Sequence, residues 1–386
     1  MEKIGIHDPT ITKEEYAEVA GTLDSGWLSS GGLKSVAFEN KLGEFLRVSC
    51  QPLATTSGTA ALKLAARVAG IQSGDHVLVS AYGFIATANA IKHLGGEPIF
   101  LGPENPLFPV VTFSQVRQFL QNQLTPQGLF KKTGRPVKGL FYNEPYGLCC
   151  PQIGEFRGLL DSRGMFFVED AAQSFGVEWD GSHLGTFGHL GVYSFNGNKT
   201  LAVGQGGALT GSKQEWLAMA KRLSSQDRTD DFDFYYGDAA YNVQISNLLA
   251  ALGLAQLKNM QEILRQKSKI RRWYREAFLG SELSLLASEL DYPAWLNIVL
   301  FPKPMDRGHF RRLASEMGEA GIQIRPTFPA VPRNQLYKNA PLFQNETIDA
   351  VFDRGICLPS GASLHTSQVE RIAKLLLEKS KKLGFL

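Results

Sequence analysis

MFFVEDAAQSFGVEWDGSHLGTFGHLGVYSFNGNKTLAVGQGGALT, residues 165–210, is the stretch that decides the fold. It opens with the apolar run 165–168, which predicts a buried strand, and this strand ends on an acidic pair that includes Asp170. Residues 192–195 predict another short strand, and Lys199 follows in a segment of small and polar residues. A carboxylate at the carboxyl end of one strand and an amine shortly after another indicate a binding site at one edge of a sheet.

Four kinds of chemical group meet in this stretch. Asp170 supplies a carboxylate and Gln173 an amide, while serines and threonines supply hydroxyls and Lys199 supplies one amine on glycine-rich backbone. Together they suit a cofactor that carries a cationic ring nitrogen, a phosphate and an aldehyde.

Length and composition set the class of protein. The chain has 386 residues, so we expect two or three regions, each with its own core. Hydrophobic residues make up 44% and charged residues 20%, as in soluble globular proteins, and the net charge of +3 gives no reason to expect a nucleic acid or a membrane as partner. No apolar run approaches the roughly 20 residues of a membrane span, and no signal-peptide core is visible, so we expect a cytoplasmic protein.

Cysteine and histidine give no sign of a metal site. The four cysteines form no CxxC pair and no cluster with histidine at ligand spacing, so we expect neither bound zinc nor a disulfide framework.

Strands and helices alternate between residues 53 and 210. We expect strands at 76–80, 97–101, 137–142, 165–168 and 192–195, and helices at 60–68, 84–94, 113–123 and 153–160. Such alternation predicts an α/β fold with a mainly parallel sheet that is flanked by helices. Two further helices, 12–26 and 35–48, come before it.

The junction between TTSGT at 55–59 and the helix at 60–68 is a candidate anion site. Small residues let the backbone come close to a ligand, and the first N–H groups of a helix have no partner inside it. Ordinary capping of the helix by Ser57 would give the same sequence, and the pattern alone leaves both interpretations open.

Beyond Thr210 the composition favours helices. We expect a helix at 217–223, an extended loop at 228–241, and either one long helix at 245–278 or two helices broken near Gly253. Strands at 297–301 and 322–325 and helices at 309–320 and 367–381 predict a smaller C-terminal α+β domain, with Gly280 and Ser281 as its plausible start. We therefore divide the chain into 1–255, a large cofactor-binding α/β domain, and 256–386, a long connecting helix and the small domain.

Six segments, in order, resemble one family. They are SGWLSSGGLKSVAFENKLGEFL (25–46), TTSGTAAL (55–62), VEDAAQSFG (168–176), YSFNGNK (193–199), GQGGALT (204–210) and YNVQISNLLAALGLAQL (241–257). Together they resemble the pyridoxal-phosphate-dependent sugar aminotransferases of the DegT/DnrJ/StrS family. The resemblance implies a fold-type I aminotransferase that acts as a homodimer with a shared active site.

The resemblance also implies roles for single residues. Lys199 matches the lysine that holds pyridoxal 5'-phosphate as a Schiff base and then moves a proton as a base. Asp170 matches the carboxylate that keeps the ring nitrogen protonated, Gln173 an amide beside the ring, and Phe84 an aromatic residue stacked on the ring. For Phe84, a plain core position is the alternative.

The phosphate group is expected to meet dipoles and hydroxyls. The resemblance assigns it to the backbone of Gly58 and Thr59, the hydroxyl of Ser194, and Asn242 from the partner subunit. It assigns no metal ligand.

Three departures from the family pattern concern the substrate more than the cofactor. Gln205 stands where glutamate is usual, Asn143, Glu144 and Pro145 replace a stretch that usually contains histidine, and Gly102 stands where aspartate is common. Dehydratases of the family carry histidine in place of the lysine, so Lys199 argues against that branch.

The resemblance implies amino transfer from L-glutamate to a nucleotide-linked keto sugar, for the synthesis of surface polysaccharide or glycan sugars. GWLSSGG at 26–32 and NGNK at 196–199 are more similar to members that act on C4 of an NDP-4-keto-6-deoxyhexose than to members that act on C3. Two alternatives stay open: an enzyme for NDP-3-keto sugars, and a catalytically silent regulator that binds the cofactor. His183 and Arg325 are polar residues expected near the mouth of the site, and we interpret both as structural.

Overall fold

The computed structural model describes residues 3–230, 232–344 and 348–386. A mixed sheet of nine strands forms its centre. The strands of this sheet are β1 (Leu53–Thr55), β2 (His76–Ser80), β3 (Glu97–Leu101), β4 (Leu129–Phe130), β5 (Arg135–Asn143), β6 (Phe166–Asp170), β9 (Leu190–Ser194), β10 (Gly207–Gly211) and β14 (Leu342–Phe343). Their order is β1-β10-β9-β6-β5-β2-β3-β14, and β4 pairs with β5. The expected α/β class is confirmed.

Most neighbouring strands in this sheet run parallel. The parallel part runs from β9 through β6, β5, β2 and β3 to β14, whereas β10 pairs antiparallel with both β9 and β1. All residues of β2 are buried, which is typical of a parallel strand covered on both faces. Parallel strands bring their carboxyl ends to one edge, and Asp170 and Ser194, the last residues of β6 and β9, therefore lie at the same edge.

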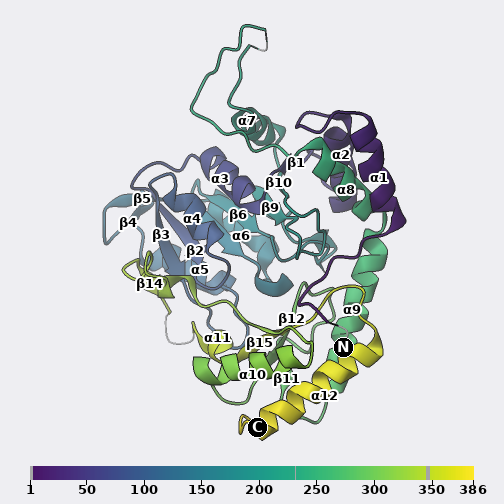
Figure 1. Cartoon of the computed structure of the whole chain (residues 1–386). Helices are drawn as coiled ribbons and strands as arrows, with labels where there is room; N and C mark the ends of the chain where they lie inside the picture. The colour runs from purple at the N-terminus through teal and green to yellow at the C-terminus, as the bar shows by residue number, and fades with distance from the viewer. Residues whose placement is uncertain (1–2, 231, 345–347) are drawn as a thin grey trace.

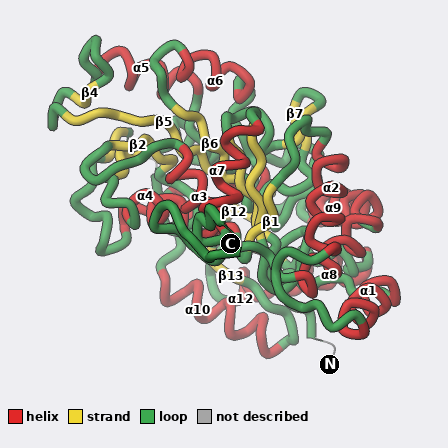
Figure 2. The backbone as a smooth tube through the Cα atoms, turned by 90° about the horizontal axis from the view of Figure 1, so that it is seen from above, coloured by secondary structure: helices red, strands yellow, loops and turns green. Residues whose placement is uncertain are grey.

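Helices cover both faces of the sheet, which lies at the centre of the molecule (Figure 2). These helices are α3 (Gly58–Val68), α4 (Ala86–Lys92) and α7 (Gln214–Ser224) on one face, and α5 (Phe113–Asn122) and α6 (Ile153–Asp161) on the other. The alternation of side chains along β2 separates the two cores: Val77 and Val79 pack with the first group, and Leu78 packs with the second.

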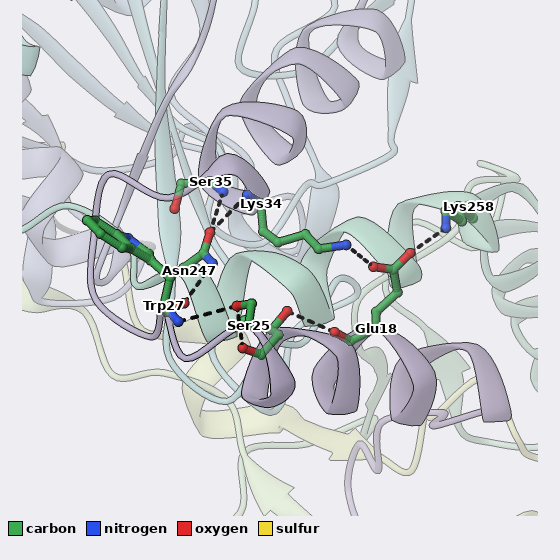
Figure 3. Close-up of polar contacts among 8 residues, drawn as sticks. Glu18, Ser25, Trp27, Lys34, Ser35, Asn247 and Lys258 are labelled. Carbon is green, nitrogen blue, oxygen red and sulfur yellow. Dashed lines mark hydrogen bonds and ion pairs between the residues drawn. The ribbon is translucent and has the colours of Figure 1, made fainter.

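A second helical group packs beside the sheet. It consists of α1 (Lys13–Asp24), α2 (Leu33–Leu46) and α8 (Asn247–Lys258). Gly32 offers no side chain to cap α2, and Asn247 replaces it: its Oδ1 accepts hydrogen bonds from the backbone N–H groups of Lys34 at 2.9 Å and Ser35 at 3.3 Å (Figure 3). Glu18 of α1 pairs with Lys34 at 2.6 Å and with Lys258 at 2.7 Å, which ties the three helices together (Figure 3).

The C-terminal part forms a smaller unit around an antiparallel sheet with the order β11-β12-β15-β13. Its elements are α9 (Met260–Ala277), β11 (Ser284–Leu285), β12 (Asn297–Leu300), α10 (Arg307–Glu319), β13 (Arg325–Pro326), α11 (Ala350–Arg354), β15 (Gly355–Leu358) and α12 (Thr366–Lys382). The N-terminal segment lies against this unit, because the N–H of Ile4 donates to the carbonyl of Gly321 at 2.8 Å (Figure 1). β14 leaves the unit and pairs with β3. The division at residue 255 stays a prediction.

Short elements complete the chain. They are the hairpin of β7 (Glu178–Trp179) and β8 (Ser182–His183), and the 3-10 turns Pro145–Gly147 and Val331–Arg333. Within the described residues, no helix has both the length and the apolar character needed to cross a bilayer.

The helix expected at 245–278 is two helices, and its predicted break near Gly253 is wrong. The chain breaks at Asn259, between α8 and α9, whereas Gly253 lies inside α8. A Cβ on Gly253 would lie 2.7 Å from a ring carbon of Phe38, so this glycine allows close packing of α8 on α2.

Two other boundaries differ from the expectation. The helix expected from Phe84 begins at Ala86, and the strand expected at 322–325 is reduced to Arg325–Pro326, with Ile322 in an isolated bridge to Ile4. The expected loop at 228–241 has no helix or strand among its described residues, and residue 231 lies outside them.

Candidate active site

A cavity of about 370 Å³ opens at the carboxyl ends of β6 and β9, between the large sheet and the C-terminal unit. Residues from eight separate stretches of the chain line it, including the N-terminal segment and β13. The predicted site residues in its wall are Gly58, Thr59, Phe84, Asp170, Gln173, Ser194 and Lys199. The fold therefore brings these seven together.

Lys199 lies in the tight turn between β9 and β10. Its backbone N–H donates to the carbonyl of Asn196 at 2.8 Å, and its Nζ lies 3.7 Å from the ring centre of Trp295. The indole N–H of Trp295 in turn donates to the carbonyl of Asn198 at 2.6 Å, so the C-terminal unit holds the turn in place. Burial lowers the pKa of Lys199 to about 8, although Asp170 opposes this shift. The amine is therefore neutral in a much larger fraction of molecules than an exposed lysine would be.

Asp170 is the last residue of β6 and is buried. Its Oδ1 accepts a hydrogen bond from the N–H of Ala172 at 3.2 Å, and its Oδ2 is in hydrogen-bond contact with the hydroxyl of Thr87. Burial raises the pKa of Asp170, while Thr87, Ala172 and the charge of Lys199 oppose that rise. A cationic group beside Asp170 would favour its carboxylate form.

Gln173 and Phe84 lie on other sides of the cavity. The Oε1 of Gln173 accepts a hydrogen bond from the N–H of Tyr146 at 3.0 Å, which leaves the amide nitrogen as the group that can donate to a ligand. Phe84 is 52% exposed, and its ring lies edge-on to Phe328 at 5.7 Å. Such exposure of a large aromatic side chain at a cavity is typical of a surface that a planar ring covers.

The N-terminus of α3 forms the other end of the cavity. Ser57 caps this helix, because its hydroxyl accepts from the N–H of Ala60 at 3.1 Å, and Gly58 and Thr59 are the first helical residues. A Cβ on Gly58 would lie 2.9 Å from the Cβ of Ser194, so only glycine leaves room here. Capping of the helix is therefore compatible with an anion site, because the first residues of α3 and Ser194 line the same cavity.

These residues fit pyridoxal phosphate. The buried carboxylate matches a cationic ring nitrogen, the amine with its lowered pKa matches an aldehyde, and the cradle at Gly58 matches a phosphate. When bound, the cofactor supplies the electron sink that makes a proton on the carbon next to the amino group removable. Among the described residues, no group of three or more histidine, cysteine, aspartate or glutamate side chains could hold a metal ion.

Of three other residues singled out in the sequence, one lines the cavity and two do not. Asn242 is exposed and does not line this cavity, as expected for a residue that would serve a partner subunit. The expected place of His183 near the mouth is wrong, because it stacks on Phe45 with 5.0 Å between ring centres and lies outside the cavity wall. Arg325 does line the cavity.

Sequence reasoning missed a buried pair of acids behind Asp170. Glu144 and Glu169 are 1% and 0% exposed, and the backbone N–H groups of Gly185 and Gly188 donate to the two oxygens of Glu169 at 3.0 and 2.5 Å. Burial raises the pKa of Glu144 well above its usual range, and the negative charge of the neighbouring Glu169 raises it further. The protonated form of Glu144 is therefore favoured. The sequence gives one signal, an apolar strand that ends in two acids, but not which acid faces the ligand.

The Glu144–Glu169 pair should make stability depend on pH. A raised pKa of Glu144 in the folded state means that its contribution is fully present below the unfolded pKa and is lost as the pH rises through the folded pKa. We expect Glu144→Gln to flatten the fall in the free energy of unfolding that begins as the pH rises above 4.5, the ordinary pKa of glutamate, by about 1.4 kcal/mol for each pH unit in which only the folded state keeps the proton. Urea denaturation at several pH values measures this slope.

The matched control is Glu155→Gln, which neutralises an exposed carboxylate on α6. It should leave the slope unchanged. An equal slope in the wild type and in Glu144→Gln would contradict a protonated Glu144.

Comparisons with known proteins show the family to which the chain is similar. The sequence profile of the DegT/DnrJ/EryC1/StrS aminotransferase family matches residues 9–377. A GDP-perosamine synthase of Escherichia coli O157:H7 is 30% identical over 382 residues, which cover 98% of this chain and 99% of that protein. A putative pyridoxal phosphate-dependent aminotransferase, EpsN of Bacillus subtilis, is 29% identical over 387 residues, 97% of this chain and 95% of that protein.

The fold also matches solved structures. The putative sugar aminotransferase Spr1654 from Streptococcus pneumoniae, in its PLP-form, superposes with a TM-score of 0.86 at 23% identity and covers 99% of both chains. The expected enzyme class, an aminotransferase that depends on pyridoxal phosphate, is confirmed. With a profile match over nearly the whole length and a fold that agrees, the chain belongs to the DegT/DnrJ/EryC1/StrS aminotransferase family.

Proposed function

We propose that the protein transfers an amino group from L-glutamate to a keto sugar that is linked to a nucleotide. The single observation that carries this proposal is Lys199, an amine with a pKa lowered to about 8, in one cavity with the buried carboxylate of Asp170. The similarity to a GDP-perosamine synthase over nearly the full length supports a nucleotide-linked sugar as acceptor.

Each residue of the site has a task in this proposal. Lys199 holds the cofactor and then, as a neutral amine, moves the proton between the two carbon atoms that exchange the amino group. Asp170 keeps the ring nitrogen charged, and Gln173 donates a hydrogen bond beside the ring. Phe84 covers one face of the ring, and the start of α3 with Ser194 holds the phosphate.

The sugar substrate is proposed to enter from the side of the C-terminal unit. Arg325 and Phe328 line that part of the cavity, and a guanidinium group beside an aromatic ring suits the charged diphosphate of a nucleotide sugar. The segments at 26–32 and 196–199 favour C4 of an NDP-4-keto-6-deoxyhexose as the reacting carbon. The alternatives are C3 of an NDP-3-keto sugar, and a regulator that binds the cofactor without turnover.

A screen of the second half-reaction tests this function. The protein is loaded with pyridoxamine phosphate and mixed with UDP-, dTDP- and GDP-linked 3-keto and 4-keto sugars, and mass spectrometry then detects amino sugars. We expect product from one 4-keto sugar, and NMR of that product gives the carbon that carries nitrogen. Product only from a 3-keto sugar would overturn the C4 assignment, and cofactor binding without any product would favour the regulator.

We also propose that the active site is shared between two subunits. The segment after α7 projects as an arm, and its described part exposes aromatic side chains to solvent (Figure 1). These are Phe232, Phe234, Tyr235 and Tyr236. Asn242 lies at the base of the arm, exposed and outside its own cavity. Burial of these rings against a second copy would bring Asn242 to the phosphate end of the partner's cavity.

Subunit mixing tests the shared site. Asn242→Ala and Lys199→Ala should each be nearly inactive alone, because every site lacks one of the two groups. After mixing and reassembly, the mixed dimer regains one intact site, so about a quarter of the wild-type activity should return. A matched mixture of Lys199→Ala with Asp170→Asn should recover nothing, because both residues come from the same subunit. No recovery in the first mixture would contradict the shared site.

A further inference from the structure

A buried threonine of α4 connects Asp170 to a neighbouring strand. Thr87 is 0% exposed, and its Oγ1 lies 2.8 Å from Oδ1 of Asn143 and in hydrogen-bond contact with Oδ2 of Asp170. Asn143 is the last residue of β5 and is 2% exposed. One hydroxyl group therefore lies between the amide oxygen of β5 and the carboxyl group of β6.

The orientation of the Asn143 amide is fixed by its other contacts. Its Nδ2 donates to the carbonyl of Tyr82 at 3.4 Å, and its backbone N–H donates to the hydroxyl of Ser80 at 3.1 Å. A Cβ on Gly83 would lie 2.1 Å from Nδ2, so the glycine makes room for the amide. The oxygen of the amide, which only accepts hydrogen bonds, therefore faces Thr87.

The hydrogen bonds among Thr87, Asn143 and Asp170 can be arranged in two ways, which differ in the protonation state of Asp170. The hydroxyl of Thr87 has one hydrogen and cannot donate it at the same time to Asn143, to Asp170 and to the carbonyl of Phe84, which lies further away at 3.4 Å. If Asp170 is a carboxylic acid, it donates to Thr87, and Thr87 donates to Asn143. If Asp170 is a carboxylate, Thr87 donates to it, and the contact between Thr87 and Asn143 loses its hydrogen. Only the acid form satisfies both contacts.

We propose that Thr87 and Asn143 are positioning residues that set the proton affinity of Asp170. Asn143 draws the hydroxyl hydrogen of Thr87 away from Asp170 and so favours the acid form while the cavity holds no cofactor. The raised pKa of Asp170 agrees with this state. The inference rests on the proposed function in one respect: the base that later takes the proton is the ring nitrogen of the cofactor.

The proton balance is simple. When the cofactor is bound, its ring nitrogen would be the base that takes the proton: the O–H bond of Asp170 would break, an N–H bond would form, and Asp170 would keep the electron pair as a carboxylate. Thr87 then turns its hydrogen from Asn143 to Asp170. Asp170 therefore ionises only when a base has taken its proton. The buried carboxylate then has both an opposite charge and a hydrogen bond from Thr87.

Other groups act on Asp170 as well. Lys199 attracts its ionised form, Ala172 donates to Oδ1 at 3.2 Å, and the neighbouring acids Glu144 and Glu169 lie behind the same strand. The N–H of Glu144 also donates to the carbonyl of Asp170 at 3.2 Å. These groups are the same in every variant below. Differences in the titration midpoint of Asp170 between the variants are therefore due to the substitutions at positions 87 and 143.

Infrared titration of the full chain without cofactor tests the proposal. The carboxylic acid band of Asp170 is identified by subtraction of the Asp170→Asn spectrum and is followed against pH. Thr87→Val keeps the shape but removes the hydroxyl, so the carboxylate loses a charge-assisted hydrogen bond and the midpoint should rise by about one pH unit. Asn143→Leu removes the competing acceptor, so the midpoint should fall by a similar amount. Thr87→Ser keeps the hydroxyl and should titrate as the wild type does.

Shifts of the Asp170 midpoint in opposite directions for Thr87→Val and Asn143→Leu distinguish this role from a role in packing alone. If both substitutions move the midpoint in the same direction, if neither moves it, or if the acid band of wild-type Asp170 titrates at or below the ordinary pKa of aspartate, the proposal is wrong. A second readout uses protein loaded with pyridoxal phosphate that carries ¹⁵N in its ring: Thr87→Val should lower the protonated fraction of that nitrogen, and Thr87→Ser should restore it. Failure to bind the cofactor would contradict the proposed function but leave the infrared result valid.

Discussion

Replacement of Lys199 by alanine should remove the covalent bond to pyridoxal phosphate and lower the transamination rate by about 10⁴- to 10⁶-fold. Lys199 is the amine in the cavity wall, and burial lowers its pKa to about 8, which makes it a good nucleophile and base near neutral pH. An alanine offers neither function. Absorbance of the bound cofactor and single-turnover rates with L-glutamate measure the two losses.

A trapping experiment identifies the amine. Borohydride reduction of the wild type loaded with pyridoxal phosphate, followed by peptide mass spectrometry, should place the adduct on Lys199. Lys267 is an internal control, because it too is buried, and its pKa is lowered to about 7. Its Nζ contacts His7 and two backbone carbonyls. An adduct on Lys267, or a variant without Lys199 that keeps its covalent band, would overturn the assignment.

Replacement of Asp170 by asparagine should lower kcat by about 10²- to 10³-fold. In the proposed mechanism the carboxylate would stabilise positive charge on the ring nitrogen, and that charge would draw electrons when a proton leaves the substrate. Asparagine has nearly the same shape and keeps the contact with Ala172 available, but it cannot carry the negative charge. Affinity for the cofactor depends mainly on the phosphate and the covalent bond, so its Kd should change by less than about tenfold.

The split between kcat and Kd is the test. Stopped-flow absorbance with L-glutamate gives the rate, and cofactor titration gives the affinity. Asp291→Asn is a matched control, because this exposed carboxylate pairs with Arg272 at the surface, at 2.9 Å, away from the cavity. It should change neither quantity. A rate for Asp170→Asn within about tenfold of the wild type would show that the carboxylate is not the partner of the ring nitrogen.

Several features of the site could be read from the sequence. The apolar residues VLV within 76–80 and IFL within 97–101 predict strands with the bounds that the structure shows, because a strand covered on both faces favours apolar side chains on both sides. Asp170 at a strand end and Lys199 in a glycine-flanked turn are also local features. Parallel topology then places them at one edge of the sheet, where the cavity lies.

Other features depended on contacts between distant parts of the chain. Gly207–Gly211 forms β10 because it pairs with β9 and β1, whereas no strand is expected at these residues from the sequence alone. The break between α8 and α9 fell at Asn259 because α8 packs on α2, where Gly253 admits Phe38. Local propensity carries no information about either partner.

What the sequence by itself determined is the alternation of strands and helices, the family resemblance, and the amine and the carboxylate of the site. Only the tertiary structure decided the surroundings that give these groups their chemistry. Burial lowers the pKa of Lys199, and Thr87 of α4 contacts both Asn143 of β5 and Asp170 of β6, which lie 56 and 83 positions away from it in the chain. The physical reason is that solvation and hydrogen-bond competition depend on which groups are near in space, and the linear order of residues does not specify that distance.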